Sequence, residues 1–207
     1  MAFFLPNFEI QFIEMRIALI DYGAGNVQSV KYAVNRLGYK PVLTKNHNEI
    51  ISADKVIFPG VGSAKAAMEQ LKDSGLDKLI PTLTQPVLGI CVGMQLMCEY
   101  SNEGDVKCLG IIDAHVKRFD GDLKIPHMGW NTISEFKSPI FEGVAEGNQV
   151  YFVHSYYVPI NKNTVATTLY GQGFSAAIQK DNFYAVQFHT EKSGDIGAQI
   201  LKQFLEL

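Results

Sequence analysis

The N-terminal half of the chain alternates short apolar runs with segments of helical spacing. Residues 16–21 (RIALID) form an apolar run, and residues 26–37 follow with apolar side chains three and four positions apart. The pattern predicts further strands at 41–44, 55–58 and 87–90, and helices at 63–72, 76–83 and 94–100. Strands that alternate with helices indicate a parallel sheet covered on both faces. Ligand chemistry in such sheets gathers at the carboxyl ends of the strands.

The pattern changes after about Gly104. Short runs separated by turn residues indicate antiparallel strands and hairpins, either appended to the sheet or continuing it. Residues 195–205 are expected to close the chain as an amphipathic helix. We therefore expect one α/β domain over residues 15–207: a flavodoxin-like, mostly parallel layered sheet with helices on both faces and an antiparallel extension.

Residues 1–14 differ from the rest of the chain. They carry four phenylalanines and no basic residue, which argues against a secretory signal. An added or misassigned start and a short docking arm are both compatible with this composition. Residues 1–14 are an N-terminal extension that need not belong to the domain.

Composition excludes several classes of function. With 207 residues, 47% hydrophobic and 19% charged, the chain is long enough for one globular domain with a full core. A net charge of −3 makes nucleic acid an unlikely partner. No apolar run approaches the ~20 residues of a membrane helix. Three cysteines, odd in number and without zinc-ligand spacing, indicate reduced thiols in a cytoplasmic protein.

Cys91 lies in the turn between an expected strand and an expected helix, within residues 89–93 (GICVG). Free backbone N–H groups and the macrodipole at a helix N-terminus stabilise a negatively charged sulfur. The flanking glycines allow the sharp turn of a nucleophile elbow. A buried cysteine that merely packs is the commoner case. The position favours a nucleophile, but the turn alone does not settle it.

A second chemical segment follows the last expected strand. His189 and Glu191 are two residues apart and share one side of an extended backbone. A carboxylate beside an imidazole orients it and stabilises its protonated form. Taken alone, a strand-end histidine paired with a surface glutamate is the simpler interpretation. Together with Cys91, the pair completes a nucleophile, a base and an orienting group. No cluster of histidines and carboxylates suggests a metal, and no cofactor is expected.

Residues 21–28 (DYGAGNVQ) have the appearance of a dinucleotide-binding turn. The third glycine position holds Gln28, however, and Lys45 and Asn46 occupy the place where an acidic residue would bind the ribose. These departures weaken a flavodoxin-like nucleotide-binding function. A tight glycine-containing loop that presents Asn26 to a partner is the preferred interpretation.

Residues 89–95 (GICVGMQ) and 189–191 (HTE) together resemble the class I, triad-type glutamine amidotransferases. Within that family, other segments resemble the glutaminase subunit of imidazole glycerol phosphate synthase. These segments are 21–26 (DYGAGN), 59–62 (PGVG), 126–131 (PHMGWN) and 151–156 (YFVHSY). The resemblance runs from about Met15 to the C-terminus.

The resemblance implies a catalytic triad of Cys91, His189 and Glu191. Cys91 would attack the side-chain carboxamide of glutamine and form a glutamyl thioester. His189 would relay protons, finally to the departing ammonia, and Glu191 would orient His189. Hydrolysis of the thioester would then release glutamate.

The resemblance also assigns the groups around the triad. The oxyanion donors would be the Val92 backbone N–H and the peptide of Gly60 and Val61, a strand that in this family can require a peptide flip. The simpler interpretation is that the glycine-rich residues 59–62 only form a turn. Gln95 and the backbone of residues 154–156 (His154, Ser155 and Tyr156) would hold the substrate glutamine.

By the same resemblance, the ammonia passes to a separate cyclase subunit of the (β/α)8-barrel type in a heterodimer. The cyclase would form imidazole glycerol phosphate and aminoimidazole carboxamide ribotide in histidine biosynthesis. A barrel takes ~250 residues, so this chain cannot contain it. Asn26 and Trp130 would lie at the interface, although Trp130 could also be a core aromatic.

Two other functions remain open at this point. A related amidotransferase could supply ammonia to another acceptor, such as a surface-polysaccharide sugar. A non-catalytic binding module of the same fold would keep Cys91 only as a structural residue.

Overall fold

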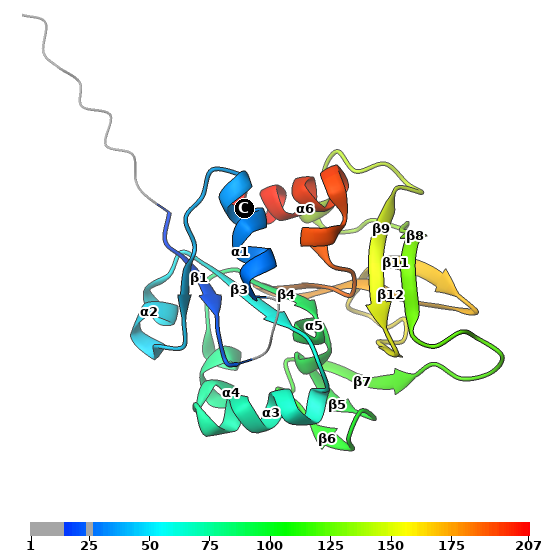
Figure 1. The fold of residues 1–207 in the computed structure, drawn as a ribbon, viewed down its shortest axis with the longest axis horizontal. Coiled ribbons are helices and arrows are strands. Elements are labelled where there is room, and N and C mark those ends of the chain that lie inside the picture. The colour runs from blue at the N-terminus through cyan, green and yellow to red at the C-terminus, as the bar shows by residue number, and fades with distance from the viewer. Residues whose placement is uncertain (1–14, 24–26) are drawn as a thin grey trace, which may run out of the picture.

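The computed structural model describes residues 15–23 and 27–207. A seven-stranded sheet forms its centre, in the order β11-β12-β13-β4-β3-β1-β2 (Figure 1). The strands are β1 (Ile17–Ile20), β2 (Val42–Thr44), β3 (Lys55–Gly60), β4 (Val87–Cys91), β11 (Thr164–Tyr170), β12 (Gln172–Lys180) and β13 (Phe183–Val186). The five strands from β13 to β2 run parallel, whereas β11 and β12 are antiparallel. The predicted mostly parallel sheet with an antiparallel extension is confirmed.

Helices cover both faces of this sheet (Figure 1). Helices α1 and α6 lie on one face, and α3 and α4 lie on the other. The helices are α1 (Val27–Arg36), α2 (His47–Ser52), α3 (Ala64–Asp73), α4 (Leu76–Leu79), α5 (Val92–Leu96) and α6 (Gly194–Glu206), with 3-10 turns η1 (Ile80–Thr82), η2 (Pro139–Phe141) and η3 (Thr190–Lys192). In α1 the buried side chains recur at the spacing expected of an amphipathic helix.

Two helical predictions need correction, and one helix was missed. The helix expected at 94–100 ends at Leu96, because Cys98 begins strand β5 and pairs with β7. The helix expected at 76–83 is split into α4 and η1 where Pro81 interrupts it. Helix α2 was not predicted at all, although Asn46 caps it by accepting hydrogen bonds from two backbone N–H groups.

The remaining strands form two smaller sheets beside the central one. One has the order β10-β7-β5-β6, and the other pairs β8 with β9. Their strands are β5 (Cys98–Ser101), β6 (Val106–Lys107), β7 (Ile112–Arg118), β8 (His127–Thr132), β9 (Gln149–His154) and β10 (Tyr156–Tyr157). The sequence left open whether the C-terminal strands continue the sheet or are appended to it, and both occur. Strands β11 to β13 continue the sheet, and β5 to β10 are appended to it.

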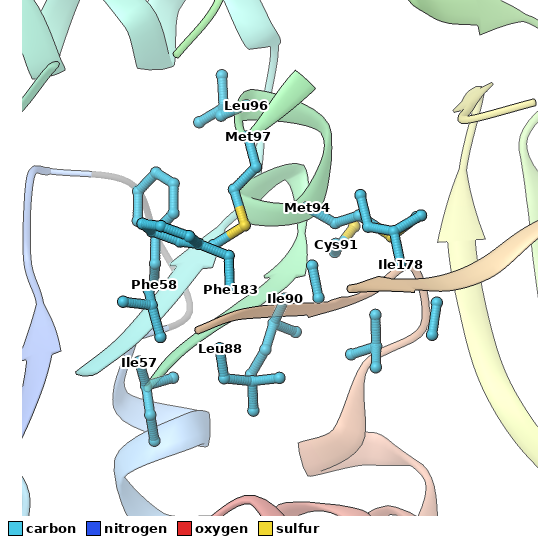
Figure 2. Packing of buried hydrophobic residues seen from close by; sticks show 14 of the residues in the cluster. Ile57, Phe58, Leu88, Ile90, Cys91, Met94, Leu96, Met97, Ile178 and Phe183 are labelled. Carbon is cyan, nitrogen blue, oxygen red and sulfur yellow. The ribbon is translucent and has the colours of Figure 1, made fainter. Parts of the chain in front are cut away.

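The core is centred on β1, β3 and β4, whose residues are all buried. Strands buried on both faces are typical of parallel sheets. Figure 2 shows part of this apolar cluster, to which Cys91, Met94 and Ile178 belong. No helix in residues 15–23 and 27–207 is long and apolar enough to cross a membrane.

Candidate active site

Three strand ends meet around Cys91. In the parallel sheet Gly60 of β3 pairs with Cys91, the last residue of β4. On the other side of β4, Val186 at the end of β13 pairs with Ile90. The segments that follow β3 and β13 therefore flank Cys91 at the carboxyl edge of the sheet, where ligand sites of such folds lie.

Cys91 has a backbone conformation that is unusual for a residue with a side chain. Its φ of 55° and ψ of −109° lie outside the regions that most residues adopt, and it immediately precedes α5. Such a conformation costs roughly 1–3 kcal/mol and persists only where its surroundings enforce it. Gly93 is part of those surroundings, since a Cβ there would lie 2.0 Å from the carbonyl oxygen of Phe58. The absence of a side chain at Gly93 thus lets α5 pack directly against β3, and this packing maintains the conformation of the turn at Cys91.

His189 and Glu191 pair as predicted, but the backbone between them is not extended. Strand β13 ends at Val186, and Glu191 lies in the 3-10 turn η3. His189 Nδ1 is 2.8 Å from Glu191 Oε1, and the two side chains are only 4% and 0% exposed. Burial lowers the pKa of His189, but its interactions with Cys91 and Glu191 outweigh this and raise the pKa to about 10. The imidazole is therefore protonated at neutral pH.

A cavity of about 530 Å³ opens beside Cys91 and His189. It brings together the predicted nucleophile, base and substrate residues with two of the predicted oxyanion residues, Val61 and Val92, whereas Gly60 does not line it. Its lining consists of Val61, Gly62, Cys91, Val92, Gln95, Glu103, Pro126, Val153, His154, Ser155, Tyr156, His189 and Lys192. Glu191 is fully buried behind His189 and does not line the cavity.

The predicted oxyanion residues lie against the nucleophile turn. A Cβ on Gly60 would lie 2.7 Å from the Gly93 nitrogen and 2.9 Å from the Tyr22 hydroxyl, so only glycine fits there. Val61 and Val92 line the same cavity as Cys91. Backbone N–H groups in such a place suit an oxyanion that develops on the substrate carbonyl oxygen when the sulfur attacks its carbon.

The family model for class-I glutamine amidotransferase matches residues 18–207. The chain belongs to this family.

Two relatives are similar to this amidotransferase over their whole length. It is 58% identical over 196 residues to the imidazole glycerol phosphate synthase subunit HisH of Bacteroides fragilis (strain YCH46), covering 93% of this chain and 100% of that protein. It is 51% identical to the HisH subunit of Yersinia pseudotuberculosis, with the same coverage.

Solved structures resemble this amidotransferase in fold. A crystal structure of a glutamine amidotransferase matches with a TM-score of 0.71 at 16% identity, covering 91% of this chain and 97% of that one. The structure of PurLQS from Thermotoga maritima matches with a TM-score of 0.70 at 14% identity, covering 94% and 99%. At such identities the likeness concerns the fold alone.

Three residues of the amidotransferase site were not predicted from the sequence. Glu103 lines the cavity and accepts a hydrogen bond of 2.8 Å from the Ala64 backbone N–H at the start of α3. Burial raises the pKa of Glu103. Lys192 also lines the cavity. It follows Glu191 in the sequence, and this place beside a triad residue could have identified it as a site residue. Gln187, fully buried, has its Nε2 3.7 Å from Cys91 Sγ.

The side-chain amide of Gln95 connects three segments of the site by hydrogen bonds. Its Nε2 donates to the backbone carbonyl of Tyr156 at 2.9 Å and to Gln187 Oε1 at 3.0 Å. Both N–H groups of the amide are therefore used within the protein. Gln95 lines the cavity as expected, and its amide also fixes the position of β10 relative to α5.

The two predicted interface residues have different outcomes. Asn26 lies outside the described residues. Trp130 is 54% exposed on β8 and contacts the edge of the Tyr151 ring, so the alternative that it is a core aromatic is wrong. Within the described part of the chain, no group of three or more His, Cys, Asp or Glu side chains could hold a metal ion.

Proposed function

We propose that this amidotransferase is the glutaminase subunit of an imidazole glycerol phosphate synthase, and that it hydrolyses glutamine to glutamate and ammonia. The observation that carries the proposal is that Cys91 and His189 line one cavity together with Val61 and Val92, while Glu191 holds His189 Nδ1 at 2.8 Å. The identity of 51–58% with named HisH subunits, over 93% of the chain, supports the choice of reaction partner.

The first half of the reaction uses the proton that His189 already carries. Cys91 Sγ attacks the carboxamide carbon of glutamine, and the developing oxyanion accepts hydrogen bonds from the backbone of Val92 and Val61. Collapse of this intermediate breaks the C–N bond, and His189 gives its proton to the departing ammonia. A glutamyl thioester on Cys91 and a neutral imidazole remain.

The second half restores the enzyme. His189 takes a proton from water as the water oxygen attacks the thioester carbon. The C–S bond breaks with its electron pair left on the sulfur, and the proton taken from water stays on His189 opposite it. The new carboxyl group of glutamate gives its proton to solvent as the product leaves. Glu191, 2.8 Å from His189 Nδ1, keeps the ring oriented and stabilises its protonated form in both halves.

The substrate is oriented by the appended strands. Glutamine carries an α-ammonium group, and Glu103 places a carboxylate in the cavity. We assign Glu103 to the ammonium group and the backbone of Ser155 and Tyr156 to the rest of the amino-acid end. Gln95 supports the Tyr156 carbonyl from behind.

The exposed face of β8 supports the choice of a docking site for the partner. Met128 and Trp130 are 62% and 54% exposed and lie two residues apart, which places both on one side of the strand. Large apolar side chains in such a position are typical of a docking surface. We infer that a (β/α)8-barrel cyclase binds here, that residues 15–207 form the amidotransferase domain, and that the complex is cytoplasmic.

The test is a glutaminase assay on the chain alone and with a candidate cyclase and its acceptor nucleotide. Glutamine-dependent formation of imidazole glycerol phosphate by the complex supports the proposal, and we expect low glutaminase activity without the cyclase. Ammonia transfer to a sugar acceptor, with no response to the cyclase, would contradict it.

A further inference from the structure

A buried tyrosine hydroxyl lies at the end of β3 and has no part in the reaction described above. Tyr22 follows the end of β1 by two residues, is 6% exposed, and packs its ring against Phe58 with ring centroids 5.6 Å apart. Its hydroxyl group is buried and has no hydrogen-bond partner among residues 15–23 and 27–207. A buried polar group without a partner destabilises a protein, and phenylalanine would fill the same space without that cost. Packing alone therefore does not explain the hydroxyl.

The hydroxyl of Tyr22 lies over the backbone of Gly60. A Cβ on Gly60 would be 2.9 Å from the hydroxyl oxygen, so the absence of a side chain there leaves this oxygen open towards the backbone. Neither Tyr22 nor Gly60 lines the cavity that contains Cys91 and Val61. The hydroxyl is thus placed behind the cavity wall, next to the peptide that joins Gly60 to Val61.

The pairing of β3 with β4 determines where the Gly60 carbonyl points. The Val56 N–H donates to the Pro86 carbonyl, directly before β4. Alternate residues of a strand direct their N–H and C=O groups to the same side, so Gly60, four residues on, also faces β4. The register of the two strands continues to this point, because Gly60 pairs with Cys91. The Gly60 carbonyl therefore faces the turn that holds the nucleophile.

This direction of the Gly60 carbonyl is unfavourable for an oxyanion at Cys91. A trans peptide is planar, and its C=O and N–H groups point in opposite directions. While the Gly60 carbonyl faces β4, the Val61 N–H points away from β4. An oxyanion needs the N–H group and is repelled by the carbonyl oxygen. The peptide between Gly60 and Val61 must therefore turn over before Val61 can donate to the substrate.

After this turn the Gly60 carbonyl needs a new donor, since buried carbonyls are nearly always hydrogen-bonded. Strand β1 lies on the side of β3 opposite to β4, and the chain that leaves β1 carries Tyr22. Burial raises the pKa of Tyr22, and the nearby Cys91 raises it further. The hydroxyl therefore keeps its proton at any working pH and is available as a donor.

We propose that Tyr22 is a positioning residue of the oxyanion hole, whose hydroxyl donates to the turned Gly60 carbonyl and so holds the Val61 N–H towards the substrate. In that state the hydroxyl gains the partner that it lacks here, and the carbonyl keeps one. Tyr22 touches no reacting atom and acts only through the peptide between Gly60 and Val61. The assignment rests on the proposed function, from which it takes glutamine hydrolysis and the Val61 donor.

Tyr22→Phe tests the assignment, because it removes only the hydroxyl and keeps the ring against Phe58. In the complex with the cyclase we expect kcat for glutamine hydrolysis to fall by about threefold to tenfold, the effect of one hydrogen bond, with little change in KM. The free energy of unfolding in urea should stay the same or rise, since an unpartnered buried group is removed. The matched control is Tyr184→Phe, which should keep kcat, because Tyr184 packs against Phe204 and does not line the cavity.

Two reagents separate support of the oxyanion from damage to the nucleophile. The aldehyde analogue of glutamine carries CHO in place of the side-chain carboxamide. The Cys91 thiol adds across its C=O bond, sulfur to carbon and proton to oxygen, and the oxygen takes the place of the oxyanion. Iodoacetamide alkylates Cys91 by displacing iodide and forms no oxyanion. We expect Tyr22→Phe to weaken inhibition by the aldehyde by the same factor as kcat, and to leave the alkylation rate of Cys91 unchanged.

Equal kcat and equal aldehyde inhibition in wild type and Tyr22→Phe would overturn the assignment. A fall in kcat with an equal fall in the alkylation rate, or with a lower free energy of unfolding, would show a packing role and overturn it as well. Failure of the proposed function has a different signature. The wild-type complex would then hydrolyse no glutamine, and the assignment of Tyr22 would fall with it.

Discussion

The cavity has two walls of different origin. The wall on the central sheet consists of the ends of β3, β4 and β13 and carries the reacting groups. The wall formed by the appended strands β5 to β10 carries Glu103, His154, Ser155 and Tyr156. The first wall depends on close backbone packing between neighbouring strands, and the second on polar contacts between segments far apart in sequence. Chemistry and recognition are thereby separated, so variants of the two walls should affect different kinetic constants.

The largest effect should come from the nucleophile on the sheet wall. Cys91→Ala removes the one sulfur that the described residues contribute to the cavity lining, and we expect glutamine hydrolysis to fall by ~10⁴-fold or more. Synthesis from free ammonia by the complex should persist. The matched control is Cys108→Ala, which removes a thiol outside the cavity and should leave both activities intact. Retained glutaminase activity in Cys91→Ala would remove Cys91 from the mechanism.

Glu191→Gln should lower kcat by about a hundredfold or more, because the neutral amide no longer stabilises the protonated imidazole. It should leave KM for glutamine nearly unchanged, since Glu191 does not line the cavity. A rise in KM at constant kcat would mean that the sheet wall also serves recognition.

The same variant should change the pH dependence of stability. The pKa of His189 rises from 6.5 to about 10 on folding, so protonated His189 contributes stability in full below about pH 6.5. That contribution is lost as the pH rises towards 10. Urea unfolding at about pH 6, 8 and 10 should therefore show a steeper loss of stability in wild type than in Glu191→Gln. Parallel curves would argue against a strongly raised pKa.

Gly93→Ala tests the close packing of the sheet wall. Its Cβ would meet the Phe58 carbonyl oxygen at 2.0 Å, so we expect a loss of about 3 kcal/mol or more in the free energy of unfolding. Gly38→Ala is the control, because a Cβ at Gly38 has nothing within 4 Å and adds only the strain of its positive φ, about 1 kcal/mol. Equal losses measured by urea unfolding would show that the contact can relax.

The smallest effect should come from the appended wall. Glu103→Gln keeps an oxygen that can accept from the Ala64 N–H but removes the negative charge from the cavity. We expect KM for glutamine to rise by about tenfold, as for the loss of one charged hydrogen bond, with little change in kcat. A fall in kcat at constant KM would contradict the separation of the two walls.

The sequence predicted the sheet wall well because its signals are local. Apolar runs and helical spacing located β1, β3 and β4, and the glycines around Cys91 indicated the turn. His189 and Glu191 were paired correctly from their two-residue spacing, although the turn between them was expected to be extended.

The appended wall was not predictable in the same way. Glu103 reaches the cavity because β5 follows α5 directly. The helix predicted at 94–100 covers the residues of β5, so the strand was not predicted. His127 and His154 are 27 positions apart in the sequence and meet only because β8 pairs with β9. Gln187 precedes His189 by two residues, but its orientation depends on Gln95 in another element. Such contacts depend on tertiary packing, which local patterns do not contain.

The central claim is that glutamine is hydrolysed through a thioester on Cys91 when the partner is bound. Acid quenching of the working complex during turnover, followed by mass spectrometry of the Cys91 peptide, tests it directly. We predict a glutamyl adduct on Cys91 that appears with glutamine and is absent in Cys91→Ala. Ammonia release at the wild-type rate from a Cys91→Ala complex, with no adduct formed, would contradict the account.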